Sequence, residues 1–278
     1  RDRIGGTWDL FRYPGVRSDS SIFTLCWSWE PWSGDEYVAD GDQIRDYMES
    51  TARKHGISPH IRFHTRVTSA DWDSATDTWT VHVSENGERK TYRSRLVFFG
   101  SGYYNYAEPY TPEFPGLADF TGTVVHPQFW PDDLDFTGKK MVVIGSGATA
   151  VSLVPALARK ASHVTMLQRS PGYMLSMPRV NPALSPIRKF LPRKASYSII
   201  RSVALTFEKL MWVVARGAPG LAKKIIRAQN ASLLPTNYPV DVNFKPRYNP
   251  WDERMCLVAD GDVFEEISKG TLEVVTDH

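Results

Sequence analysis

The sequence predicts an α/β protein that combines a parallel βαβ unit, an antiparallel β-meander and a helical insert. Three observations lead to this fold class. The glycine-rich run Gly145–Ala150 lies between an apolar strand pattern and a helical pattern, and a second apolar run follows. Residues 61–95 alternate apolar and polar side chains, as strands do. Residues 183–236 show helical periodicity and carry many basic side chains.

Length and composition narrow the class of protein. With 278 residues the chain is long enough for about two domains, and its 42% hydrophobic and 23% charged residues are typical of globular proteins. Its net charge of +2 provides no general attraction to nucleic acid. Two cysteines are too few for a disulfide framework or a metal cluster, so we expect a cytoplasmic protein without a metal site. No stretch has the pattern of a signal peptide or a membrane span.

The first third of the chain begins irregularly and continues into a helix and a sheet. Residues 5–37 are rich in Gly, Pro, Trp and Tyr, which is typical of an aromatic-rich surface loop. Helical spacing runs from Asp42, a suitable N-cap, to Gly56, a suitable C-cap. Period-two patterns then predict a strand over 61–67 and a meander that follows it. We expect Leu96–Phe99 to form a short buried strand.

A proline-rich connector near 105–116 leads to the βαβ unit. The apolar run at 140–144 predicts a strand, residues 148–160 predict a helix, and Val164–Leu167 predicts the parallel return strand. A helix of residues 262–268 and a terminal strand follow further along the chain. The chain therefore contains one complete Rossmann-like unit.

The glycine motif of this unit predicts dinucleotide binding. Gly145 would make the tight turn, Gly147 would let a pyrophosphate approach the N–H groups of the helix N-terminus, and Ala150 would keep the helix close to the sheet. By itself the motif leaves an ordinary strand–helix turn open. The strand that follows ends in Arg169, where NAD enzymes have a carboxylate. Because a guanidinium suits a 2′-phosphate, we predict NADP, with an ordinary surface charge as the alternative.

The helical insert at about 183–236 has an uneven charge balance. Ten Lys and Arg residues between 188 and 227 accompany one acid, Glu208. Two interpretations stay open: a helical cap with a solvated charged face, or peripheral contact with an anionic membrane surface through 188–227.

A second motif lies just before the βαβ unit. The run Phe120-x-Gly122-x-x-x-His126-x-x-x-Trp130-Pro131 resembles the fingerprint of Baeyer–Villiger monooxygenases, a branch of the flavin-containing monooxygenase superfamily. Other members of the superfamily have a looser version without the Trp-Pro ending. The resemblance extends over the whole chain and is closest to the actinobacterial subgroup that oxidises ketones and thioamides.

The resemblance implies FAD and NADPH as cofactors and two Rossmann-like nucleotide domains. Residues 1–108 would be part of the FAD domain, residues 109–256 the NADP domain with the helical insert, and residues 257–278 the start of the return to the FAD domain. The FAD domain would be incomplete at both ends, because the chain lacks the βαβ unit that would hold the FAD pyrophosphate. We therefore expect a fragment that is inactive in isolation.

The resemblance also assigns cofactor contacts. FAD would be contacted by Gly5, Gly6, Thr7, Trp8, Asp19 and, through its backbone, Val67. NADP would be contacted by Arg17, Ser18, Asp19, Gly145, Ser146, Gly147, Ala148, Thr149, Ala150, Arg169 and Ser170. Since Glu253 stands where some members have a phosphate-binding Lys, Arg169 would bear more of the 2′-phosphate binding, helped by Lys245 or Arg247.

The implied reaction inserts one oxygen atom from O₂ into a ketone, through a flavin C4a-peroxide, to give an ester. Arg254 aligns with the catalytic arginine of the family, and Asp19 would orient it by an ion pair. His126 and Trp130 would lie at the hinge between the nucleotide domains. Oxygen transfer to a sulfur-containing substrate would use the same oxidant. An S- or N-oxygenating flavin monooxygenase and an inactive truncated product are the alternatives.

Overall fold

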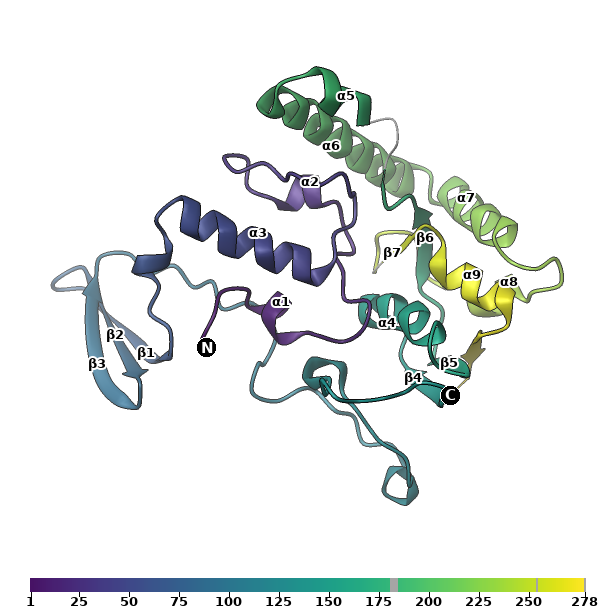
Figure 1. The fold of residues 1–278 in the computed structure, drawn as a ribbon, viewed down its shortest axis with the longest axis horizontal. Coiled ribbons are helices and arrows are strands. Elements are labelled where there is room, and N and C mark those ends of the chain that lie inside the picture. Colours follow the sequence, from purple (N-terminus) through teal and green to yellow (C-terminus); the bar gives the residue numbers. More distant parts are fainter. Residues whose placement is uncertain (181–184, 254, 278) are drawn as a thin grey trace. The chain divides into compact units, whose positions relative to one another are not determined.

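The computed structural model describes residues 1–180, 185–253 and 255–277. The chain forms two compact units, and the ribbon of each can be followed in Figure 1. The first unit consists of Arg1–Leu10 and Asp42–Gln128, and the second of Phe11–Gly41 and Phe129–His278. Arg254, the predicted catalytic arginine, lies outside the described residues.

The first unit contains the predicted helix and the predicted meander. Its helices and strands are α1 (Thr7–Leu10), α3 (Gly41–Lys54), β1 (Thr65–Asp73), β2 (Thr78–Glu85) and β3 (Glu88–Ser94), with short 3-10 turns at Ser58–His60, Leu117–Asp119 and Pro127–Phe129. The strands pair antiparallel in the order β1-β2-β3, so the meander is confirmed. A bulge between Val67 and Ser69 lets one strand, β1, take the place of the two short strands expected there.

The predicted strand at Leu96–Phe99 is wrong for this structure. Leu96 is 81% exposed and Phe98 is 92% exposed, and the segment has no regular secondary structure. A strand needs a neighbour to pair its backbone N–H and C=O groups. Within the described residues, Leu96–Phe99 pairs with no strand. The apolar run is therefore present without the sheet that would bury it.

The second unit is built around the predicted βαβ motif. Its elements are α2 (Ile22–Leu25), β4 (Lys140–Ile144), α4 (Ala148–Ala158), β5 (His163–Gln168), β6 (Tyr173–Met177), α5 (Ser185–Phe190), α6 (Arg193–Gly217), α7 (Pro219–Ser232), α8 (Val240–Asn243), β7 (Met255–Ala259), α9 (Asp262–Lys269) and β8 (Leu272–Thr276). In the described part of the chain, β4, β5 and β8 form a parallel sheet in that order. Helix α4 packs against β4, β5 and α9 and buries Val151, Val154 and Leu157.

Residues 257–277 belong to the second compact unit, and their assignment to the start of a return to the FAD domain stays a prediction. β8 pairs with β5 along its whole length, and β7 pairs in parallel with β6. Helix α9 packs against α4, and its residues Val263 and Phe264 are buried. The β6–β7 pair has no counterpart among the predicted strands, since pairing between segments about 80 residues apart leaves no local pattern in the sequence.

Residues 11–41 include most of the segment 5–37 that the composition predicts as a surface loop, and they contribute to the core of the second unit although Trp27 and Trp29 stay exposed. Phe11, Tyr13, Phe23 and Tyr37 are all buried. Gly15, with φ +80°, lies against α4 so closely that an added Cβ would overlap the carbonyl oxygen of Ser152. Apolar burial outweighs the cost of ordering a segment with little secondary structure.

We predict that Gly15→Ala destabilises the protein more than Gly138→Ala does. Both glycines have positive φ, but only the Cβ at Gly15 meets neighbours, including Ala156 Cβ at 2.8 Å, whereas the Cβ at Gly138 meets no described atom within 4 Å. Gly138→Ala should cost about 1 kcal/mol of strain, and Gly15→Ala about 2 kcal/mol more because of the overlap. Thermal unfolding of the two variants measures the difference. Equal shifts in Tm would show that residues 11–41 do not pack tightly on α4.

Candidate dinucleotide site at the start of α4

The glycine-rich turn between β4 and α4 has the geometry that its sequence predicted. Gly145 has φ +126°, a conformation that side chains other than that of glycine rarely adopt, and its N–H donates to the carbonyl oxygen of Leu167 at 2.8 Å. Among the described residues, no atom lies within 4 Å of a Cβ built at Gly145. The turn is therefore held to β5 on one side and open on the other.

The N-terminus of α4 is suited to bind an anion. Gly147 is the N-cap in an extended conformation, and because it has no side chain it cannot cap the first N–H groups of the helix itself. Those N–H groups carry the positive end of the helix dipole. Ala150 is buried, so the first turn of α4 lies close to the sheet. A pyrophosphate would fit this turn without displacing a protein side chain from the cap position.

Arg169 and Ser170 follow β5 and are both exposed. They lie at the carboxyl end of a strand parallel to β4, hence at the edge of the sheet where the glycine turn begins. Among the ion pairs of the described residues, none includes Arg169. Its guanidinium is therefore available to a ligand.

Gln168, the last residue of β5, holds the end of that strand in place by two hydrogen bonds. Its buried side-chain amide donates to the carbonyl oxygen of Asn243 and to Thr276 Oγ1, both at 2.9 Å. The segment after Asn243 carries exposed Lys245 and Arg247, the two cations proposed from the sequence to assist Arg169. The hydrogen bond thus joins the strand end that bears Arg169 to the segment that bears the other two cations.

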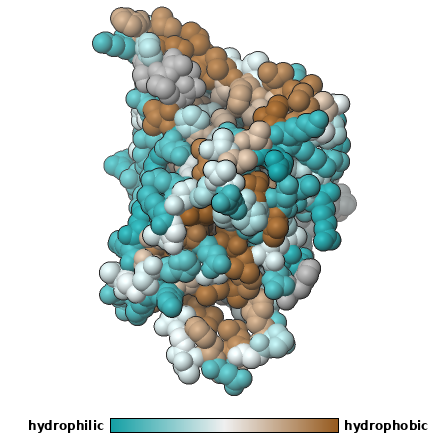
Figure 2. Space-filling view, turned by 90° about the vertical axis from the view of Figure 1, so that its right-hand side faces the viewer, coloured by the Kyte–Doolittle hydropathy of each residue, from teal (hydrophilic) through white to brown (hydrophobic). Residues whose placement is uncertain are grey.

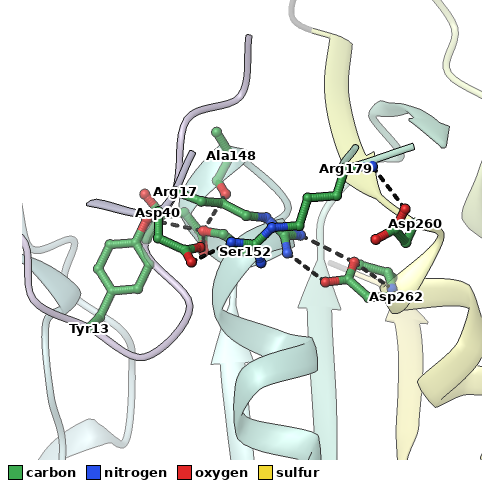
Figure 3. Close-up of polar contacts among 10 residues, drawn as sticks. Tyr13, Arg17, Asp40, Ala148, Ser152, Arg179, Asp260 and Asp262 are labelled. Atoms are coloured by element: carbon green, nitrogen blue, oxygen red, sulfur yellow. Dashed lines mark hydrogen bonds and ion pairs between the residues drawn. The ribbon is translucent and has the colours of Figure 1, made fainter. Parts of the chain in front are cut away.

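The loop at 11–41 is tied to this region by a polar network (Figure 3). Tyr13 Oη lies 3.1 Å from Ser152 Oγ on α4, and burial raises the pKa of the Tyr13 hydroxyl. Arg17 forms a two-pronged ion pair with Asp262, the first residue of α9, with N–O distances of 2.6 and 3.1 Å. Both side chains are about nine-tenths buried. The guanidinium of Arg17 is therefore buried and already paired within the protein.

Arg179 is the second cation of this polar network. Arg17 and Asp40 form an antiparallel bridge, and the Asp40 carboxylate pairs with the guanidinium of Arg179, which lies just after β6 (Figure 3). The backbone N–H of Arg179 donates to Asp260 Oδ1 at 2.8 Å. The loop is thus joined to the carboxyl ends of both β6 and β7. Asp260, Asp262 and Arg179 were missed in the sequence, because none of them belongs to a local motif.

Ser18 and Asp19 follow Arg17 and differ in exposure. Ser18 is buried, and its Oγ accepts a hydrogen bond from the backbone N–H of Ala39 at 3.1 Å. Asp19 is exposed and receives a long hydrogen bond of 3.5 Å from Ser20. Ser18 therefore shapes the loop, and the carboxylate of Asp19 is left facing outward.

In the first unit, the predicted FAD contacts surround a glycine turn at the start of α1. Gly5 has φ +133°, and a Cβ there would lie 2.9 Å from Asp9 Cβ, so a larger residue does not fit. Gly6 also has positive φ, Thr7 Oγ1 lies 2.9 Å from Tyr106 Oη, and Trp8 is half-buried. Val67 lies apart from this turn on β1, with its side chain 56% exposed.

The glycine of the fingerprint, Gly122, is explained by packing. The ring of Phe120 covers Gly122 so closely that a Cβ at Gly122 would lie 2.6 Å from Phe120 Cε1. Phe120 itself is 60% exposed. Spacing of an aromatic residue two positions before a glycine therefore corresponds to a direct contact between the two.

The later part of the fingerprint crosses the boundary between the two compact units, which falls after Gln128. His126 Nδ1 accepts from the N–H of Gln128 at 3.2 Å, and the buried Gln128 amide donates to Asn105 at 2.7 Å. Burial lowers the pKa of His126, which favours the neutral ring that this bond requires. In the second unit, Trp130 packs edge-to-face on Phe136, and Pro131 begins the turn before β4.

The segment around Arg254 is described on either side of that residue. Glu253 is exposed, and Asp252 pairs with Arg216 at 2.6 Å. In the residues that the structure describes, no group of three His, Cys, Asp or Glu side chains could hold a metal ion.

Comparison with known proteins gives one family and several relatives. Residues 11–219 match the flavin-binding monooxygenase-like family. The chain is 48% identical over 278 residues to the FAD-containing monooxygenase EthA of Mycolicibacterium smegmatis, covering 100% of the chain and 56% of that relative. It is 44% identical over 283 residues to the putative FAD-containing monooxygenase MymA of Mycobacterium tuberculosis, again covering all of the chain and 57% of the relative. The chain thus spans a little over half the length of these relatives.

Solved structures share the fold. An oxidized steroid monooxygenase bound to NADP superimposes with a TM-score of 0.77 at 25% identity, covering 98% of this chain and 59% of that one. An ε-caprolactone-bound cyclohexanone monooxygenase gives a TM-score of 0.74 at 24% identity, covering 99% of this chain and 60% of that one. The α/β fold predicted from the sequence is confirmed by these similarities.

We predict that breaking the Arg17–Asp262 pair destabilises the protein far more than breaking Arg216–Asp252. Both pairs have an N–O distance of 2.6 Å, but the Arg17 and Asp262 side chains are 10% and 8% exposed, against 51% and 38% for the control pair. Asp262→Ala leaves a buried guanidinium unpaired and should cost about 3 kcal/mol, whereas Asp252→Ala should cost less than about 1 kcal/mol.

Thermal unfolding of the complete protein provides the measurement. Adding Arg17→Met to Asp262→Ala should recover part of the lost stability, because the unpaired charge is removed. A double variant as unstable as the sum of its two single variants would contradict this account of the pair.

Proposed function

Because this chain belongs to the flavin-binding monooxygenase-like family, we propose that the complete protein is an FAD- and NADPH-dependent Baeyer–Villiger monooxygenase. Its reaction would insert one oxygen atom from O₂ into a ketone to give an ester. The observation that carries the proposal is the fingerprint from Phe120 to Pro131, directly followed by a βαβ unit that ends in exposed Arg169. The relatives EthA and MymA are named as FAD-containing monooxygenases, which supports the same cofactor.

The residues of the second unit suit NADP. The N–H groups at the start of α4, in the run Ser146–Ala150, would bind the pyrophosphate, since Gly147 leaves them uncapped. Arg169 and Ser170, with Lys245 or Arg247, would bind the 2′-phosphate. FAD would lie along Gly5–Trp8 in the first unit, with a further backbone contact at Val67. When bound, the two cofactors supply the electrons and the activation of O₂.

In the proposed reaction, residues of this chain would position the loop that presents Asp19 and would stabilise negative charge on the reacting oxygen atoms. The buried Arg17–Asp262 pair and the Tyr13–Ser152 contact hold the loop that presents Asp19. In this proposal, the carboxylate of Asp19 orients the guanidinium of Arg254 by an ion pair. That guanidinium stabilises the negative charge that develops on the reacting oxygen atoms. Arg17 contributes to cofactor binding through the position of the loop, because its own guanidinium is paired within the protein.

The proposed hinge role of His126 and Trp130 is supported by their positions on the two sides of the unit boundary. His126 is fixed through Gln128 in the first unit, and Trp130 is fixed on Phe136 in the second. A segment anchored independently on both sides can transmit a change in one unit to the other.

We expect Arg169→Ala to raise the KM for NADPH by about 10- to 100-fold, the loss of one charge-assisted phosphate contact. The KM for NADH should change little, since NADH has no 2′-phosphate. Steady-state kinetics with both cofactors make the measurement. Lys140→Ala serves as the control, because Lys140 is the first residue of β4 and therefore lies at the amino end of the strands, whereas Arg169 follows the carboxyl end of β5. Equal effects of Arg169→Ala on NADPH and NADH would refute the phosphate contact.

Arg254→Ala should leave NADPH oxidation running while ester formation falls below detection, because the residue acts after flavin reduction in this proposal. Product analysis by gas chromatography with a cyclic ketone and a thioether gives the readout. Arg254→Lys should recover part of the ester yield, since it keeps a cation at the same place. Sulfoxide without ester from the unaltered protein would favour an S-oxygenating enzyme, and normal ester yield from Arg254→Ala would refute the role of Arg254.

A further inference from the structure

Helices α6 and α7 of the second unit carry a set of exposed apolar side chains. On α6, one side packs inward through buried Tyr197, Ile200, Ala204 and Ala215. The other side carries apolar residues that are each 41–59% exposed, which together we call the α6–α7 face: Ile199, Val203, Leu210, Val213, Leu221 and Ile225. Brown surface at the top of Figure 2 marks the hydrophobic side chains of this region.

The spacing of these residues shows that the α6–α7 face is continuous. Ile199, Val203, Leu210 and Val213 of α6 are four, seven and three residues apart, which keeps them on one side of a helix. On α7, Leu221 and Ile225 repeat the step of four, while Ala222 and Ile226 are buried on the inward side. A helix that is apolar both inward and outward is normally covered on both sides. The α6–α7 face therefore has the character of a surface that binds a partner.

The charges around the face are almost all positive. Between residues 185 and 233 the sequence has ten Lys and Arg residues and one acid, Glu208. Glu208 is directed inward, because its Oε1 accepts a hydrogen bond from Tyr37 Oη at 3.0 Å. The outward side of α6 and α7 thus has no carboxylate. Any carboxylate that opposes the positive charge of these helices on their outward side must come from another segment of the chain.

The arginines and lysines of the insert differ in pairing. Four arginines form ion pairs with acids from other segments: Arg188 with Asp35, Arg193 with Glu30, Arg216 with Asp252 and Arg227 with Asp241. By contrast, the structure shows no ion pair, within the parts it describes, for Lys189, Lys194, Lys209, Lys223 or Lys224. Lys209 and Lys224 each lie next to a residue of the face, Leu210 and Ile225. The unneutralised charge is therefore beside the apolar stripe.

We propose that the α6–α7 face binds the surface of an anionic lipid bilayer. Exposed apolar side chains would enter the boundary between headgroups and acyl chains, with Trp212, which is 51% exposed, at the headgroup level. The unpaired lysines would contact the anionic headgroups. Attachment would be peripheral, since no helix in the described residues is long and apolar enough to cross a bilayer.

A second copy of the chain suits this face less well than lipid does. Two identical faces brought together would place their lysines opposite one another, and like charges across an interface cost several kcal/mol. An anionic bilayer offers both an apolar layer and opposite charge. Charge complementarity thus favours the lipid surface over a second copy of the chain.

Vesicle sedimentation of the complete protein tests the proposal. We expect the protein to sediment with vesicles of phosphatidylcholine mixed with phosphatidylglycerol, to sediment much less with phosphatidylcholine alone, and to be released as salt is raised. Binding that is equal for both vesicle types, or absent from both, would overturn it. This measurement requires no variant, so a folding defect cannot obscure the result.

Two double variants locate the contact. Lys209→Gln/Lys224→Gln should weaken binding about 25-fold, from about fivefold for each lysine, and Leu210→Ser/Ile225→Ser should weaken it on the order of 100-fold. Controls with the same changes elsewhere, Lys139→Gln/Lys160→Gln and Ile57→Ser/Leu96→Ser, should bind as the unaltered protein does. All four should keep the unfolding midpoint and the rate of NADPH oxidation in detergent-free buffer. Dimerisation in solution that Leu210→Ser/Ile225→Ser abolishes would instead assign the face to a second copy.

Discussion

The buried ion pair between Arg17 and Asp262 is the constraint on which the arrangement of the second unit depends. It joins a loop near the beginning of the chain to the first residue of α9, and both charges are nearly removed from water. Isolated, either charge would be too costly to bury, so each requires the other in place. The aromatic segment at 11–41 and the β7–α9 turn therefore take up their positions together.

Because of that pair, the loop next to α4 is a fixed part of the proposed NADP site. Gly15 packs on the carbonyl of Ser152, and the Ser152 hydroxyl lies against Tyr13. Both contacts are one turn beyond the uncapped N–H groups of α4. The helix thus has two roles: its N-terminus is open for a phosphate, and its following turn carries the loop that presents Asp19.

Charge is distributed differently over the two parts of the second unit. Around β6, β7 and α9 the cations Arg17 and Arg179 are each matched by a carboxylate. Among the described residues, exposed cations that form no ion pair include Arg169, at the proposed phosphate site, and lysines of α6 and α7. Cations that pair with carboxylates of the protein stabilise the fold, and cations that form no such pair are available to bind anions.

Local patterns in the sequence determined the βαβ unit, the meander, the long helices and the cation after β5. Each depends on side-chain period or on the conformational freedom of a glycine such as Gly145, and both can be recognised within a few residues. Tertiary structure alone decided that Phe11, Tyr13, Phe23 and Tyr37 are buried, that Arg17 pairs with Asp262, and that no strand among the described residues lies beside Leu96–Phe99. These depend on contacts between segments far apart in the chain, and the free energy of such contacts leaves no periodic pattern in either segment.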